Sequence, residues 1–188
     1  MPQWQGGDEP AYRFGSELLR WLAPPHDGPE ETVAVPEPDG SSPPVSRGIK
    51  WCAALLSQAR AAREAIERHA PDRIVTLGGD CLVDLAPMAY LNRRYGEKLG
   101  VLWLDAHPDV MSAAEFSHAH AHVLALLLGR GDEAFTAEVP RKLDARRVMI
   151  AGMQGWNADE DLILKELGIR HIPPAVLADS SRPILDWI

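Results

Sequence analysis

The chain has 188 residues, of which 46% are hydrophobic and 24% are charged, the composition of an ordinary soluble globular protein. A net charge of −8 argues against nucleic acid and anionic membrane as main partners. No apolar run is long enough for a membrane span, and the N-terminus lacks the basic start and apolar core of a signal peptide. Cys52 and Cys81 do not make a disulfide framework, so the cytoplasm is the expected location.

The N-terminal part of the chain predicts a helix, a long loop and a second helix. Residues 11–23 place apolar side chains on one broad face, and Pro24 ends this helix. Residues 24–48 are rich in proline, glycine and acids, so we expect a surface loop with a short strand over 32–35. Residues 49–69 repeat apolar positions at helical spacing.

From residue 73 onward, short apolar strands alternate with helices. Strands are expected at 73–77, 100–104, 147–152 and 169–172, and helices at 84–95, 117–128, 158–167 and 182–188. Such alternation is typical of a parallel sheet covered by helices. We therefore predict a three-layer α/β fold with right-handed crossovers, in a single domain over residues 1–188.

The strand at 100–104 ends in three ionisable side chains, Asp105, His107 and Asp109. Ligands of parallel α/β sheets bind at the carboxyl ends of the strands, and this spacing places all three on one side of an extended backbone. Burying two carboxylates with an imidazole is costly unless they are paired or hold a cation, and this donor set suits Mn, Fe or Zn. The simpler interpretation is a solvated turn in which Asp105 caps a helix. The local pattern does not choose between them.

Two further motifs flank this cluster. Gly78-Gly79-Asp80-Cys81 follows the first of these strands, and its paired glycines permit close backbone approach. Taken alone, this motif favours a plain tight turn with an inert buried cysteine. Downstream, His118, His120 and His122 would spread around a helix, so only one or two can point at the acidic cluster. A lone histidine is usually structural, but three beside an acidic cluster favour a proton shuttle.

Together these motifs resemble the arginase/agmatinase, or ureohydrolase, family. The resemblance covers residues 66–172: Gly-Gly-Asp at a strand end, Asp105-Ala-His-Pro-Asp109 next, and His120 ahead of Leu127-Leu128-Gly129. It implies an arginase-like α/β fold and a binuclear manganese centre, whose bridging hydroxide attacks a guanidinium carbon and releases urea. Family members are commonly oligomeric, so the resemblance also implies a homo-oligomer.

Position by position, the resemblance makes Asp105, His107 and Asp109 metal ligands and His120 the catalytic histidine near the substrate. Cys81 stands where the family's Gly-Gly-Asp-His motif places a metal-ligating histidine. A thiolate is softer than imidazole and favours Zn or Fe over Mn. Alternatively, Cys81 is a small buried thiol, and one metal position is weakened or empty.

Two other departures from the family pattern affect the expected function. The chain lacks the later Ser-X-Asp-X-Asp strand that completes the family's site, so we expect a sheet that is incomplete at the C-terminus and a centre for one dication rather than two. Between Asp109 and His120, Met111 and Phe116 stand where arginases use small polar residues. This difference disfavours arginine itself as the substrate.

We therefore expect a metal-dependent hydrolase of linear C–N bonds, acting on a small guanidino or amidino compound. The alternative is a catalytically degenerate or truncated arginase-fold protein that acts as a binding or partner subunit, as the cysteine at position 81 and the missing aspartates suggest. A third hypothesis is a Cys–His hydrolase with Cys81 as the nucleophile and His120 or His107 as the base. Only their expected proximity at strand ends favours it.

Overall fold

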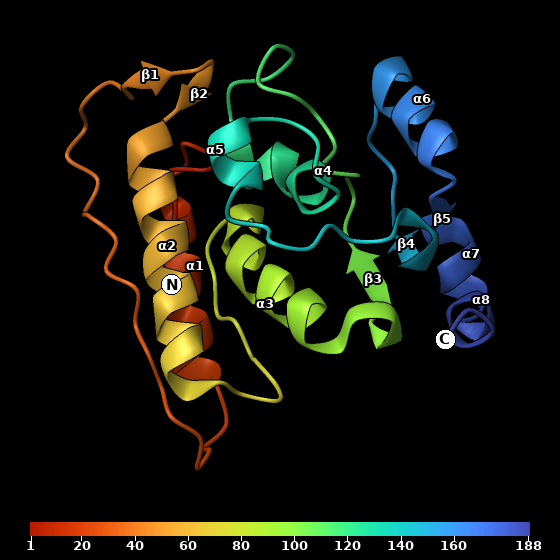
Figure 1. Ribbon diagram of the computed structural model, residues 1–188, viewed down its shortest axis with the longest axis horizontal. Helices are drawn as coiled ribbons and strands as arrows, with labels where there is room; N and C mark the ends of the chain where they lie inside the picture. The colour runs from red at the N-terminus through yellow and green to blue at the C-terminus, as the bar shows by residue number, and fades with distance from the viewer.

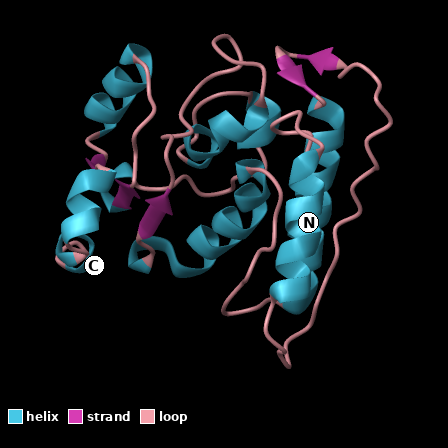
Figure 2. Ribbon diagram, turned by 180° about the vertical axis from the view of Figure 1, so that it is seen from behind, coloured by secondary structure: helices cyan, strands magenta, loops and turns pink.

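The computed structural model describes residues 1–188. The N-terminus and the C-terminus lie at opposite sides of the molecule (Figure 1). The N-terminal helices lie at one side and the C-terminal helices at the other, as the view from behind also shows (Figure 2). The α-helices are α1 (Ala11–Leu22), α2 (Cys52–His69), α3 (Leu85–Tyr95), α4 (Val123–Leu127), α5 (Glu133–Thr136), α6 (Ala158–Leu167), α7 (Pro174–Asp179) and α8 (Arg182–Leu185). The 3-10 helices are η1 (Cys81–Asp84), η2 (Gly96–Lys98), η3 (Ala119–His122) and η4 (Ala145–Arg147).

A three-stranded parallel sheet lies in the C-terminal half, in the order β3 (Val101–Leu104), β4 (Val148–Ala151) and β5 (Arg170–Ile172). The central strand β4 is buried along its whole length, as expected for an apolar run in a helix-covered parallel sheet. A second, two-stranded antiparallel sheet joins β1 (Val45–Ser46) to β2 (Ile49–Lys50). The predicted α/β fold with a helix-covered parallel sheet is confirmed.

The main hydrophobic core lies between the parallel sheet and helices α2, α3 and α4. Every residue of α4 is buried, because this short helix passes through the middle of the core. Along α2, the buried side chains include Leu55, Ala59 and Ala62, which recur at the helical spacing seen in the sequence. No helix of the structure combines the length and the apolar character needed to cross a membrane.

Two of the predicted strands are wrong. Residues 32–35 and residues 73–77 have no strand hydrogen bonding, and the side chain of Val75 is 87% exposed. Residues 73–77 have the composition of a strand, but they pair with no other strand, and the sheet ends at β3. A strand depends on its hydrogen-bonded neighbour as much as on its own sequence.

The predicted helix boundaries also need correction at two places. Helix α2 begins at Cys52 rather than at residue 49, because Ile49 and Lys50 pair with β1 and Trp51 adopts a left-handed conformation, with φ 56°. The histidine-rich run forms the 3-10 helix η3 before α4 begins at Val123. Helices α5 and α7 were not predicted; each is short, so neither shows a full amphipathic repeat.

The N-terminal segment packs tightly against the glycine turn that precedes η1. The amino group of Met1 donates a hydrogen bond to the Leu77 carbonyl at 2.7 Å, and the Asp80 amide donates to the Gln3 carbonyl at 3.1 Å. A Cβ atom on Gly79 would lie 1.7 Å from the Gln3 carbonyl oxygen. Only glycine therefore permits this close approach of two backbone segments.

We expect Gly79→Ala to destabilise the fold by about 2 kcal/mol or more, because the methyl group must push the two backbones apart. Urea unfolding followed by circular dichroism measures the change. Gly15→Ala is the matched control: Gly15 lies in α1 with nothing within 4 Å of an added Cβ, so alanine should stabilise that helix by about 0.5–1 kcal/mol. Equal stabilities of the Gly79 variant and the wild type would contradict the close contact.

Candidate metal centre

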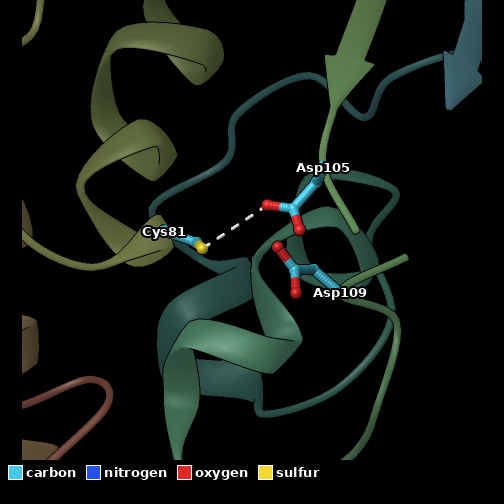
Figure 3. A group of neighbouring side chains, drawn as sticks. All are labelled: Cys81, Asp105 and Asp109. Atoms are coloured by element: carbon cyan, nitrogen blue, oxygen red, sulfur yellow. Dashed lines mark hydrogen bonds between the residues drawn. The ribbon is translucent and has the colours of Figure 1, made fainter. Parts of the chain in front are cut away.

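Three of the residues singled out in the sequence, Cys81, Asp105 and Asp109, come together in space. One ligand atom from each lies within 4.8 Å of the others, and Figure 3 shows the three side chains pointing toward one another. The Cys81 thiol donates a hydrogen bond to Asp105 Oδ2, with an S···O distance of 3.8 Å. Cys81 opens η1, whereas Asp105 and Asp109 follow β3, so the fold unites two separate motifs.

The backbone around Asp105 fixes its carboxylate at the end of the sheet. The Asp105 amide donates to the Ala151 carbonyl at 3.2 Å, which continues the β3–β4 ladder by one residue. Its Oδ1 atom accepts the amide hydrogen of His107 at 2.9 Å, which leaves Oδ2 to face the Cys81 thiol. The carboxylate is thus oriented by the chain that follows it, in an Asx-type turn.

Asp109 is held by the start of α4. It adopts a left-handed conformation with φ 52°, which aspartate tolerates better than most residues. Its carbonyl oxygen accepts amide hydrogens from Leu124 at 3.1 Å and Ala125 at 3.2 Å. The residue is only 2% exposed, and its Oδ2 atom is buried without a hydrogen-bond partner. An unpartnered buried carboxylate oxygen is costly, and a cation is one of the few groups that satisfy it.

The electrostatics of the cluster point the same way. Burial, together with the negative charge of Asp105, raises the pKa of Asp109 to about 8, although the nearby Cys81 and Trp103 side chains partly oppose the shift. Burial, with the charges of Asp109 and Asp105, also raises the pKa of the Cys81 thiol. A divalent cation would offset the repulsion between these groups, so the residues fit a metal ion in both donor chemistry and charge.

His107, the fourth predicted ligand, does not lie within this group. Its side chain is 67% exposed, and its Nδ1 atom is 3.7 Å from Asp105 Oδ1. The ring faces the loop after β4, where a Cβ on Gly155 would lie 3.1 Å from its Nε2 atom. His107 therefore borders the cluster from the solvent side, and its role as a ligand stays a prediction.

His120 is joined to the glycine turn through the N-terminal segment. Its Nδ1 atom lies 3.0 Å from the Gly6 carbonyl oxygen; because a carbonyl only accepts, Nδ1 carries the hydrogen and Nε2 of the neutral ring is left as the base. The Gly6 amide in turn donates to Asp80 Oδ2 at 2.9 Å, and Asp80 Oδ1 accepts from the Leu82 amide. Gly6 was not predicted as part of the site, since nothing local marks a contact over 74 residues.

The residues beside His120 form a partly aromatic border. The Phe116 ring lies 4.6 Å from the His118 ring and 5.9 Å from the His120 ring, measured between centroids. Lys50 places its ammonium 3.1 Å from His118 Nε2 and 2.8 Å from a carboxylate oxygen of Asp8. The sequence does not mark Asp8 or Lys50 as site residues, because both come from segments without a recognisable motif.

His122 has a different environment from the other two histidines of this run. It is buried, and its Nε2 atom lies 2.8 Å from the Phe116 carbonyl oxygen. Burial lowers the pKa of His122, although the hydrogen bond to Phe116 partly opposes that effect. His122 therefore supports the loop that carries Phe116.

The sequence profile of the Arginase family matches residues 40–184 of this chain. The chain belongs to the arginase family. Curated relatives include an arginase of Bacillus caldovelox, 31% identical over 128 residues that cover 61% of this chain and 42% of the relative. The arginase of Coccidioides immitis is 28% identical over 160 residues, covering 77% of this chain and 48% of that protein.

Solved arginase structures share the fold. The Entamoeba histolytica arginase in complex with L-ornithine superposes with a TM-score of 0.79 at 18% identity, over 98% of this chain and 66% of that one. The native Bacillus caldovelox arginase gives a TM-score of 0.67 at 22% identity, over 81% of this chain and 53% of that structure. The chain spans less than half the length of the two curated arginases compared above.

We expect Asp109→Asn to stabilise the metal-free protein at pH 7 by on the order of 1 kcal/mol, because burial and the neighbouring Asp105 penalise the ionised carboxylate and force it to hold a proton, whereas asparagine is neutral without one. Asparagine also tolerates the left-handed backbone at this position. The same variant should bind divalent cations at least about tenfold more weakly. Thermal unfolding in a chelator and isothermal titration measure the two effects. Asp179→Asn is the control, since that residue is exposed at the end of α7; a less stable Asp109 variant would contradict the prediction.

We expect His122→Gln to reduce the loss of stability on acidification. Because burial holds the folded-state pKa of His122 below the unfolded value of about 6.5, its contribution is complete above that value and declines as the pH falls below it. Between pH 7 and 5, the wild type should lose up to about 1.4 kcal/mol per pH unit more than the variant. Urea titrations across this range test it, with the exposed His26→Gln as control. Parallel pH profiles for His122→Gln and the wild type would contradict it.

Proposed function

We propose that this arginase-family chain is a metal-dependent hydrolase that cleaves a linear C–N bond of a guanidino or amidino compound. The observation that carries the proposal is the buried, unpartnered Oδ2 atom of Asp109, set beside Cys81 and Asp105 at the end of the parallel sheet. The L-ornithine named with the Entamoeba histolytica arginase supports a small amino compound as a ligand of this fold.

Cys81, Asp105 and Asp109 would hold the metal, with His107 at the solvent side as a further ligand. A bound dication supplies Lewis acidity, which makes water a nucleophile at neutral pH. For a guanidino substrate, water adds to the guanidinium carbon and the C–N bond to the alkyl nitrogen breaks, which gives urea and a protonated amine. The free Nε2 atom of His120 is the group that would take up the proton released by the attacking water and then pass it to the departing nitrogen.

The surroundings of the centre favour a cationic substrate. The cluster holds two carboxylates, and the net charge of the chain is −8, so a guanidinium or amidinium group is drawn toward it. Phe116 presents an aromatic ring beside His120, and such rings bind planar cations through their faces. Tyr12 adds a second ring on the same side, because a Cβ on Gly7 would lie 2.5 Å from Tyr12 and 3.6 Å from His120 Nδ1.

The test is urea release from a panel of guanidino compounds by the full chain loaded with Mn²⁺ or Zn²⁺. We expect His120→Asn to lower kcat by about 10²–10⁴-fold without changing metal content, because only proton transfer is lost. Asp105→Asn should lose metal and activity together. Cys52→Ala is the control, since Cys52 is buried in the main core, away from the metal cluster.

Two results would contradict this function. One is metal binding without release of urea or ammonia from any guanidino or amidino compound, which would favour a catalytically degenerate partner subunit. The other is an activity that persists unchanged in His120→Asn and Asp105→Asn, which would place the chemistry elsewhere in the molecule.

A further inference from the structure

We propose that Cys81 is a metal ligand and that its thiolate makes this centre select a thiophilic dication such as Zn²⁺ over Mn²⁺. The inference deepens the proposed function, because it concerns the same centre. The inference concerns metal binding, whereas the proposed function concerns turnover, so an experiment can contradict one without the other.

The separation of the donor atoms fits a shared ion. Cys81 Sγ lies 3.8 Å from Asp105 Oδ2. In a tetrahedral zinc site, bonds of about 2.3 Å to sulfur and about 2.1 Å to oxygen place those two atoms about 3.6 Å apart. The metal-free arrangement therefore needs only a small side-chain movement for both atoms to bind one ion.

The second carboxylate gives independent support for a ligand at this position. Asp109 is 2% exposed, and its Oδ2 atom has no hydrogen-bond partner although it belongs to the same cluster. Cys81 and Asp105 can satisfy each other through the S–H···O contact, but that contact leaves the Oδ2 atom of Asp109 without a partner. A cation held by all three atoms would provide the missing partner.

The thiol sets the preference among metals. On binding, the Cys81 S–H bond gives its proton to solvent and a sulfur–metal bond forms, with no change of oxidation state. Thiolate is a soft ligand that favours Zn²⁺, whereas carboxylates alone suit Mn²⁺ nearly as well as other hard dications. A histidine at this position would be a harder ligand, so Cys81→His isolates the contribution of the sulfur.

The experiment titrates the metal-free full chain with Co²⁺, a spectroscopic substitute for Zn²⁺. We expect a thiolate-to-cobalt charge-transfer absorption in the near ultraviolet for the wild type and for Cys52→Ala. The second cysteine is the matched control because it is a buried free thiol outside the cluster, with an Arg47 nitrogen 3.0 Å from its sulfur. The absorption should disappear in Cys81→Ser, and the ratio of Mn²⁺ to Zn²⁺ dissociation constants should fall at least about tenfold in Cys81→His.

A measurement on the wild type alone tests the inference even if the Cys81 variants do not fold. Zn²⁺ should slow alkylation of Cys81, read by peptide mass spectrometry, whereas Mn²⁺ should protect it less. An unprotected Cys81 in zinc-saturated protein, or an unchanged cobalt spectrum in folded Cys81→Ser, would overturn the inference. Urea release without protection of Cys81 would refute only the inference, and a cobalt–thiolate signal without any turnover would refute only the proposed function.

Discussion

The placing of two carboxylates side by side, with Asp109 buried and Asp105 half-buried, is the constraint on which this structure depends. The charge of Asp105 helps to raise the pKa of Asp109, and no lysine or arginine lies within the cluster to oppose this; His107 approaches Asp105 only from the solvent side. The two carboxylates stay together because backbone hydrogen bonds fix each residue separately, one through the β3–β4 ladder and the other through the start of α4. The sheet and the helix thus impose an arrangement that the side chains alone would not adopt, as is common at functional sites.

The N-terminal segment links the two halves of the site. Gly6 donates its amide to Asp80, next to Cys81, and its carbonyl oxygen accepts from the ring of His120. The close packing of Gln3 on Gly79 holds this segment in place. Because the metal cluster and the histidine share one backbone support, a shift in the glycine turn would move both of them together.

The residues of the metal cluster are predictable from the sequence because each is marked by the residues just before it. Asp105 and Asp109 follow an apolar run, and Cys81 follows a glycine pair, so each carries a signal within a few residues. The pairing of Lys50 with Asp8 carries no such signal, since it joins unpatterned segments 42 residues apart. Residues 73–77 show the converse: their apolar pattern is that of a strand, but a strand also needs a neighbour, which the sequence does not display.

The identity of residue 81 also changes how the centre depends on its metal. A histidine between two carboxylates can take up a proton and compensate part of their charge, whereas a thiol can only lose one. In the metal-free protein, Cys81 therefore relieves Asp105 by a single weak S–H hydrogen bond and does nothing for the unpartnered oxygen of Asp109. A cation at this centre accordingly contributes more to folding stability than it would beside a histidine, which couples metal binding to the folded state more closely.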